Sequence, residues 1–351
     1  MSESRRHELD PWYLSNLVCP RDRTVLTLSG GALVCEKQHR YPIVDGIPVM
    51  LVDEAPETIG IAAASLAAAS RPDTTGLHVD TLSLSDDERQ GILELNRSGS
   101  AIDPVVAYLV AATNGMMYRH LIGTLARYPI PELPMPDGRG QLLLDIGCSW
   151  GRWTLAAAAR GYDAVGIDPS LGAVLAATRV AAALGRKARF VVGDARHLPF
   201  RDGAFDAAYS YSVIQHLSYV DAATAVGEIG RVVRMSGLVR VQMPTRYGVR
   251  CLYHQARRRF RAAIGFEVRY WTWPQLRALF TAAIGETRLE VDGFFGIGLQ
   301  PVDRPLMTPA LRAVLAASQS LKAASRLFPV LKRGADSVFV EAVRTASVPQ
   351  S

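Results

Sequence analysis

The stretch from Leu142 to Gly151 reads LLLDIGCSWG and constrains the fold more than any other part of this chain of 351 residues. Three aliphatic residues lead into Asp145, a turn carries Gly147 and Gly151, and a helix-forming segment follows. An apolar strand that ends in a glycine turn before a helix is typical of α/β proteins that bind nucleotide-like ligands. Glycine lets the backbone approach a ligand, and the helix start offers free N–H donors. The stretch therefore predicts a ligand site at this turn.

Similar strand-and-turn units follow at helix-length intervals. After the first strand we expect strands at residues 161–167, 188–192, 205–209, 238–243, 288–295 and 337–343. Asp168 ends the second unit, where a carboxylate can accept hydrogen bonds from two ribose hydroxyls. Asp194 ends the third unit and could accept from an adenine amino group. The repeated acid at the strand ends argues against a plain strand-to-helix connection.

Five segments in this order resemble the class I S-adenosylmethionine-dependent methyltransferases. The resemblance spans roughly residues 105–345 and rests on the glycine turn at 145–151, VGIDPS ending at residue 170, GDARHLPF from 193, FDAAYSYSVIQHL from 205 and RVVRMSGLVRVQMP from 231. It implies an α/β, Rossmann-like fold: a seven-stranded, mostly parallel sheet with helices on both faces. One position departs from the family, because Ser149 replaces its middle glycine. A nicotinamide dehydrogenase is the nearest alternative, but its G-x-G-x-x-G fingerprint is absent from this turn.

The resemblance implies S-adenosylmethionine as the cofactor and a set of residues around it. The residues expected there are Asp145, Gly147, Cys148, Ser149, Gly151, Asp168, Pro169, Ser170, Gly193, Asp194, Ala195, Ser212, Gln215 and Tyr118. Tyr118 belongs to a helix expected over residues 105–127, which in the family lies over the cofactor. The alternative for this helix is simple packing on the sheet edge.

His216 is the candidate catalytic residue. Methyl transfer is an in-line displacement that depends chiefly on alignment, and a base helps only when the acceptor is weakly acidic. His216 follows the fourth strand at the carboxyl edge of the sheet, and histidine titrates near neutral pH. The alternative is a structural histidine that bonds a loop backbone. Tyr253 and His254 are weaker candidates.

A basic run could contact the acceptor. It contains Arg257, Arg258, Arg259 and Arg261, with Arg246 and Arg250 upstream. Arginines interleaved with aromatic residues could hold phosphate or carboxylate groups. RNA binding and a solvated helix face are the alternatives.

Residues 1–55 form a small, β-rich module with hairpin turns at Gly30–Gly31 and Asp45–Gly46. The motifs LVCP, LVC and YPIVDGIPVML resemble the zinc-ribbon family that activates tRNA and protein methyltransferases. The expected ligands of a structural zinc ion are Cys19, Asp22, Cys35 and His39. All four residue types bind zinc, although the usual set is richer in cysteine. The alternative is a metal-free module held by its apolar strands.

The remaining division of the chain follows from composition. Residues 56–104 are expected to be a linker with a helical segment capped by Ser85 and Glu88. The resemblance implies a methyltransferase domain over residues 105–345, with insertions at about 245–273 and 305–332 that would wall the acceptor pocket. The four cysteines form no dense disulfide framework, and neither a signal peptide nor a membrane-spanning run is visible. We therefore expect a cytoplasmic protein.

The leading functional hypothesis is methyl transfer to a small-molecule acceptor: a sugar, a lipid or a secondary-metabolite intermediate. The net charge of +6 is compatible with an anionic acceptor. The second hypothesis is a tRNA- or protein-modifying methyltransferase with a fused activator module. The third is a non-catalytic S-adenosylmethionine-binding protein. The sequence leaves open the acceptor atom and the oligomeric state.

Overall fold

The computed structural model describes residues 9–54, 60–71, 73–296 and 299–345. Its larger sheet has seven strands in the order β10-β11-β9-β8-β5-β6-β7. These strands are β5 (Leu142–Ile146), β6 (Asp163–Asp168), β7 (Arg189–Val192), β8 (Phe205–Tyr211), β9 (Val233–Pro244), β10 (Gly285–Gly293) and β11 (Ser337–Arg344). β7, β6, β5, β8 and β9 pair in parallel, and only β11 runs antiparallel to its neighbours. The seven-stranded, mostly parallel sheet expected from the sequence is confirmed.

Alternate residues of the central strands enter separate cores on the two faces of this sheet. Leu144 and Ile146 of β5 pack in the core that also holds α7 (Tyr219–Val232) and α9 (Trp273–Ala283). Leu143 faces the other side, where it shares a core with α5 (Arg152–Ala159). On that side α6 (Leu171–Ala183) packs against β6 and β7. Because both faces are covered, the central strands read as continuous apolar runs.

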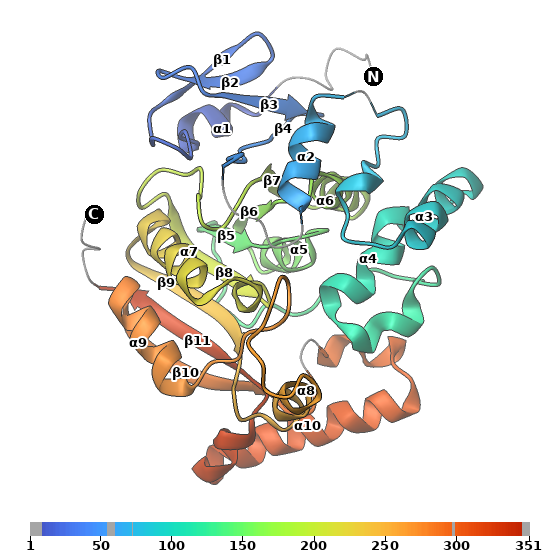
Figure 1. The fold of residues 1–351 in the computed structure, drawn as a ribbon, viewed down its shortest axis with the longest axis vertical. Coiled ribbons are helices and arrows are strands. Elements are labelled where there is room, and N and C mark those ends of the chain that lie inside the picture. The colour runs from blue at the N-terminus through green and yellow to red at the C-terminus, as the bar shows by residue number, and fades with distance from the viewer. Residues whose placement is uncertain (1–8, 55–59, 72, 297–298, 346–351) are drawn as a thin grey trace.

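The N-terminal module has a four-stranded antiparallel sheet in the order β1-β2-β3-β4. Its elements are α1 (Pro11–Asn16), β1 (Leu26–Ser29), β2 (Ala32–Cys35), β3 (Arg40–Val44) and β4 (Ile47–Pro48). Both expected hairpin turns are confirmed, since β1 joins β2 and β3 joins β4 at those glycines. The module lies beside β7, the edge strand of the large sheet (Figure 1).

The module and the large sheet share one core. Beyond β4, Val49 forms a parallel bridge to Val192 of β7, and the Met50 amide donates to the Val192 carbonyl at 2.7 Å. Leu33 and Tyr41 are buried in the same apolar cluster as Val191. The module therefore packs as a continuation of the large domain and is not a detached unit.

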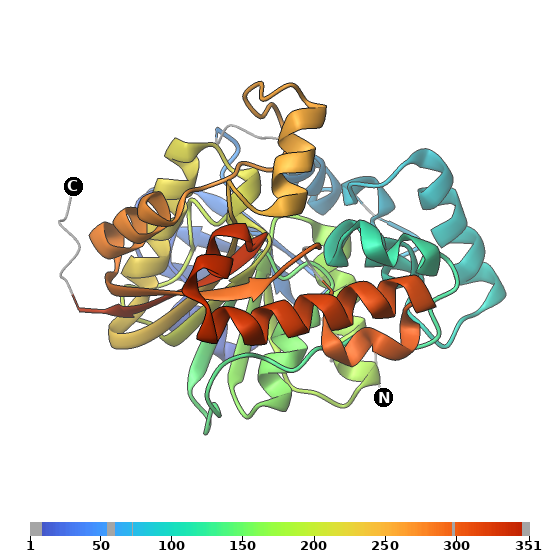
Figure 2. The ribbon, with the colours of Figure 1, turned by 90° about the horizontal axis from the view of Figure 1, so that it is seen from below.

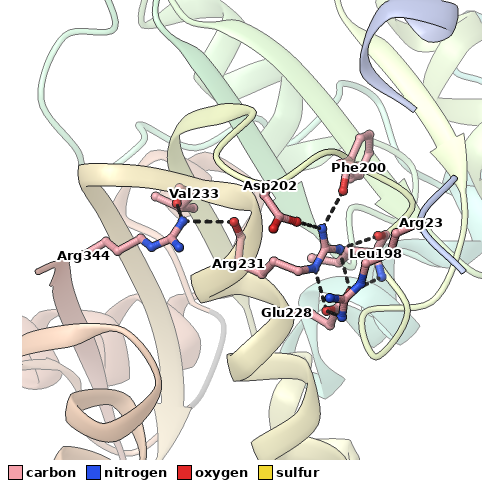
Figure 3. A network of polar contacts seen from close by, with 8 residues as sticks. All are labelled: Arg23, Leu198, Phe200, Asp202, Glu228, Arg231, Val233 and Arg344. Carbon is pink, nitrogen blue, oxygen red and sulfur yellow. Dashed lines mark hydrogen bonds and ion pairs between the residues drawn. The ribbon is translucent and has the colours of Figure 1, made fainter. Parts of the chain in front are cut away.

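An ion-pair network reinforces this contact (Figure 3). Glu228 of α7 accepts from Arg231 at 2.7 Å and from Arg23 of the module at 3.2 Å. The Arg231 guanidinium also contacts Asp202 at 2.8 Å, and the Arg231 carbonyl accepts from Arg344 of β11 at 3.0 Å. The side chain of Arg231 is only 8% exposed, so its charge depends on these partners.

The segment expected as a linker is folded, over its described residues, against the domain of the large sheet. It contains α2 (Ile61–Ala69), a short 3₁₀ helix (Val79–Thr81) and α3 (Asp86–Ser98), which has the expected capping box. The buried Thr81 hydroxyl accepts from the Gly172 amide at 2.8 Å, and Ser65 accepts from the Leu171 amide at 3.0 Å. These hydroxyls, which suggested a linker by composition, in fact satisfy the first amides of α6.

Two further expectations need correction. The helix expected over residues 105–127 is interrupted: α4 (Pro104–Asn114) ends at Gly115, whose φ is 102°, and a 3₁₀ helix (Met116–Leu121) follows. The two insertions also lie apart: α8 (Val249–Arg257) and α10 (Pro309–Leu327) overlap in Figure 1 but separate in Figure 2. Among the residues described, no helix combines the length and apolar character needed to cross a membrane.

Candidate functional site

A cavity of about 270 Å³ opens at the carboxyl ends of the parallel strands. Its walls include residues directly after β5, β6 and β7, together with the end of β8. The chain runs from β5 outward to β7 and then returns to place β8 on the other side of β5. In open α/β sheets, ligands bind at such a reversal of strand order. We call this space the first cavity.

Asp168 lies in the wall of the first cavity at the end of β6. Its carboxylate accepts from the Ser149 amide at 2.9 Å and from the Ser170 amide at 3.0 Å. Burial raises the pKa of Asp168 to about 6 despite these two hydrogen bonds. A carboxylate offers about four lone-pair sites, so two remain for hydroxyl donors from a ligand.

Steric crowding around the turn after β5 requires glycine at two of its positions. Gly147 has a φ of 74°, and a Cβ there would lie 2.2 Å from a methyl carbon of Val213. Gly151 has a φ of 82°, and its Cβ would lie 3.0 Å from Ala177. Ser149 also adopts a left-handed φ of 47°, which costs a residue with a side chain about 1–2 kcal/mol. The serine therefore fits the conformation of the glycine that it replaces, with some strain.

Asp194 lines the first cavity after β7, together with an arginine that sequence reasoning missed. Arg196 donates to both oxygens of Asp194, with contacts of 2.6 and 3.0 Å. Hydrogen bonding to Asp194 raises the pKa of Arg196, so the pair stays charged. The two residues occur in the GDAR motif, but their spacing alone did not show that they form a pair. The expected residues Gly147, Ser149, Asp168, Pro169, Ser170, Gly193, Asp194, Ala195 and Ser212 all line this cavity.

Five residues expected at the cofactor lie outside the lining of the first cavity. Asp145 is buried beneath the turn and accepts from the Thr154 hydroxyl at 2.7 Å; burial raises its pKa to about 7. Cys148 is buried behind the turn, and burial raises the pKa of its thiol. Gly151 begins α5 and packs against α6. These three residues shape the turn from behind.

Tyr118 and Gln215 are the other two expected cofactor residues that lie outside the lining of the first cavity. Tyr118 is fully buried, and its hydroxyl contacts Asp303 and Arg152 in an internal network. Because the helix is interrupted at Gly115, Tyr118 lies in this internal network and not in the wall of the first cavity. Gln215 lines a second cavity instead of the first.

The second cavity has a volume of about 610 Å³ and adjoins the first. Its walls come from the end of α4, the loop after β8, and the insertion that contains α8. The two cavities share Ala112, Thr113, Ser212 and His216. No described residue from 305–332 lines either one, so the expectation that both insertions wall the site is wrong for the second insertion. Its helix α10 packs against β10 instead.

His216 stands where the two cavities meet. Its Nδ1 lies 2.7 Å from the Phe266 carbonyl oxygen, so Nδ1 carries the proton and Nε2 is the acceptor. The Gln215 side-chain amide lies 3.2 Å from Nε2, and the Phe266 ring stacks on the imidazole with centroids 3.9 Å apart. Burial lowers the pKa of His216 to about 4, so the ring is neutral at neutral pH. His216 therefore shows the feature expected of a structural histidine, a bond to a loop carbonyl, and also lies in the wall of both cavities, as a catalytic base would.

The four residues expected to bind zinc lie together in the module. The ligand atoms of Cys19, Asp22, Cys35 and His39 lie within 4.8 Å of one another. His39 Nδ1 is 3.4 Å from each sulfur and 3.3 Å from the Asp22 carboxylate. A tetrahedral zinc ion with bonds of about 2.0–2.3 Å holds its ligand atoms roughly 3.3–3.8 Å apart. The geometry and the donor types fit that ion.

Comparison with known proteins finds relatives of both parts of the chain. A model described as a methyltransferase domain matches residues 143–237. Ajmaline N-methyltransferase from Rauvolfia serpentina is 39% identical over 101 residues, which is 28% of this chain and 34% of that enzyme. Demethylmenaquinone methyltransferase from Thermus thermophilus is 35% identical over 124 residues, or 34% of this chain and 50% of that enzyme. Residues 143–237 therefore match a methyltransferase domain, and the resemblance of this part of the chain to the class I S-adenosylmethionine-dependent methyltransferases is confirmed.

The N-terminal module has its own relative. A UPF0434 protein from Vesicomyosocius okutanii subsp. Calyptogena okutanii (strain HA) is 46% identical over 50 residues, which is 14% of this chain and 85% of that protein. This match supports the zinc-ribbon resemblance of the module. The chain spans only a third to a half of the length of the two curated methyltransferases described above.

Proposed function

We propose that this protein transfers a methyl group from S-adenosylmethionine, held in the first cavity, to a small-molecule acceptor held in the second. The junction of the two cavities at Ser212 and His216 carries the proposal. A methyl donor and its acceptor must meet in line, and such a junction allows them to meet.

Each strand end contributes one part of the proposed cofactor site. The glycine turn allows close approach of its backbone to the methionine end, Asp168 accepts from the ribose hydroxyls, and Asp194 accepts from the adenine amino group. S-adenosylmethionine supplies the activated methyl group on its sulfonium. The protein supplies position and exclusion of water, which can contribute several kcal/mol.

His216 is proposed as the base for an acceptor that must lose a proton. The Nδ1 bond to the Phe266 carbonyl leaves the Nε2 lone pair available once the Gln215 amide moves aside. Replacing the imidazole in His216→Gln should lower kcat and leave cofactor affinity within about twofold. An unchanged kcat would assign His216 a purely structural role.

Two observations favour a small acceptor over RNA or protein. Of the described residues 9–54 in the module, none lines either cavity, so the module contributes no wall to the site. Two of the relatives are named for small-molecule acceptors, ajmaline and demethylmenaquinone. The module is therefore assigned a structural role rather than presentation of a macromolecule.

The proposal is tested with methyl-labelled S-adenosylmethionine and a cell extract separated into RNA, protein, lipid and small-molecule pools. Label in the small-molecule or lipid pool is expected. Label in RNA or protein would overturn the acceptor class. Cofactor binding without any labelled product would favour a non-catalytic binding protein. An Asp168→Asn variant serves as the control for non-enzymatic labelling.

We further propose a structural zinc ion in the module, bound by Cys19, Asp22, Cys35 and His39. The hydroxyl of Tyr41 lies 3.1 Å from the Cys19 sulfur and would donate a hydrogen bond that orients this sulfur toward the ion. Metal analysis of the purified protein should find about one zinc per chain, and Cys35→Ser should lose most of it. A metal-free wild-type protein with unchanged thermal stability after zinc addition would retire the site.

A further inference from the structure

We infer that the second cavity selects acceptors that carry an oxyanion, a carboxylate or a phosphate monoester, near the methylated position. The inference rests on the proposed function, because it treats this cavity as the acceptor site. It concerns the charge of the acceptor, which the proposed function leaves open.

The lining of the second cavity is strongly cationic. Three arginines line it, Arg250, Arg257 and Arg258, and Glu267 is its sole acid among the described residues. Glu267 is already neutralised, because both of its oxygens accept from Arg261 at 2.7 Å. The cavity therefore has excess positive charge that an anionic ligand would balance.

The three arginines differ in the hydrogen bonds and ion pairs that their side chains make within the protein. Arg258 donates to the Val268 carbonyl at 3.0 Å and lies 3.9 Å from Glu267. Neither Arg250 nor Arg257 makes an ion pair within the part of the chain that the structure describes. Arginine recognises carboxylate and phosphate through paired N–H donors. These two side chains are thus the proposed anion-binding groups.

Two buried amide side chains provide an independent sign of a polar ligand. Asn114 is 3% exposed, and its Nδ2 donor has no hydrogen-bond partner in the described structure. Gln215 is 4% exposed, and its Oε1 acceptor is likewise without a partner there. Both residues line the second cavity, and buried polar groups in native proteins are usually satisfied.

The two unpartnered atoms complement a specific kind of acceptor. Both atoms are themselves buried, so each would meet a ligand after a rotation of its side chain. Asn114 Nδ2 is a donor, which suits the oxyanion, whereas Gln215 Oε1 is an acceptor, which suits the hydroxyl or amine to be methylated. Gln215 is adjacent to His216, where the two cavities meet. An acceptor with an anionic group at Arg250 and Arg257 would therefore present its nucleophile toward the first cavity.

The electrostatic environment of His254 agrees with this assignment. Burial, and then the charges of Arg250 and Arg257, lower the pKa of this histidine, which also lines the cavity. The basic run is also divided: Arg259 and Arg261 lie outside the lining, and Arg261 is paired. A continuous track for a nucleic-acid backbone would use the run as a whole, so a single anionic group fits this arrangement better.

The test uses phenyl phosphate and benzoate as probes and benzyl alcohol as the uncharged comparison. Binding is measured by saturation-transfer NMR on the full chain with S-adenosylhomocysteine present. Both anions should bind at least about tenfold more tightly than benzyl alcohol. Arg250→Gln and Arg257→Gln should each remove most of that preference. Arg259→Gln is the matched control, because it removes a charge from the same run outside the cavity.

Equal binding of the charged and uncharged probes would overturn the inference, and so would an equal loss in Arg259→Gln. Thermal melting of each variant verifies that it is folded. S-adenosylhomocysteine binding is measured separately by calorimetry. Its absence from the wild-type protein would refute the proposed function, whereas intact cofactor binding without anion preference would refute this inference alone.

Discussion

Asp168→Asn should weaken S-adenosylhomocysteine binding sharply. Both carboxylate oxygens already accept from a backbone amide, Ser149 or Ser170, so the proposed ribose hydroxyls bond to the remaining lone pairs. Asparagine keeps one acceptor and turns a donor toward the other amide. Hydrogen bonds to a charged group contribute about 1.5–3 kcal/mol each, so we expect a loss of about 2–4 kcal/mol, or roughly 30- to 700-fold in Kd.

The same carboxylate predicts a pH dependence of cofactor affinity. Burial raises the pKa of free Asp168 to about 6, and donation by two hydroxyls favours the ionised form in the complex. Binding therefore releases a proton below about pH 6, and affinity falls as the pH drops through that value. From linkage, the wild-type affinity should be about tenfold weaker at pH 5 than at pH 7. The Asp168→Asn protein should lack this dependence.

Isothermal calorimetry with S-adenosylhomocysteine at a series of pH values measures both effects. Asp163→Asn is the matched control, because Asp163 begins the same strand and pairs with Arg189 at its half-exposed end. Circular dichroism melting confirms that each variant is folded. An Asp168→Asn protein with wild-type affinity would refute the ribose role. A persistent pH dependence in that variant would assign the titration to another group.

Three further substitutions test the turn and the module contact. Gly147→Ala should destabilise the fold by about 2–5 kcal/mol in chemical denaturation, because its Cβ would overlap Val213 and its φ is left-handed; a loss under about 1 kcal/mol would contradict this. Ser149→Gly should raise the free energy of unfolding by about 0.5–1 kcal/mol by relieving its positive φ, and lower stability would show that the serine hydroxyl makes a stabilising contact. Glu228→Gln should cost about 1–3 kcal/mol, because buried Arg231 loses a charged partner, and a neutral result in thermal melting would show that Asp202 suffices.

The parallel sheet could be predicted because its strands are local, apolar and separated by helix-length gaps. Leu143 and Leu144 are both fully buried, one on each face, and so read as an uninterrupted apolar run. Asp168 could be placed because the carboxyl ends of parallel strands meet at one edge. Its proposed contact with a ribose remains a prediction.

Contacts made across long sequence separations could not be predicted in this way. Ile61 and Leu82 line the first cavity from a segment whose composition indicated a linker. Tyr118 is removed from that cavity by a helix break at Gly115, an effect of one residue within an otherwise continuous apolar pattern. The pairing of Asp194 with Arg196 depends on side-chain direction, which sequence spacing leaves undetermined.

The position of the N-terminal module bears on why it is fused to this domain. β7 is an edge strand, and an uncovered edge exposes unpaired backbone groups. Met50 donates to the carbonyl of Val192, the residue that directly precedes Gly193 in the cavity wall. The module thus closes the sheet edge and supports the strand that presents Asp194. The described residues of the module line neither cavity, so the contact of the module with the site is this indirect one through β7.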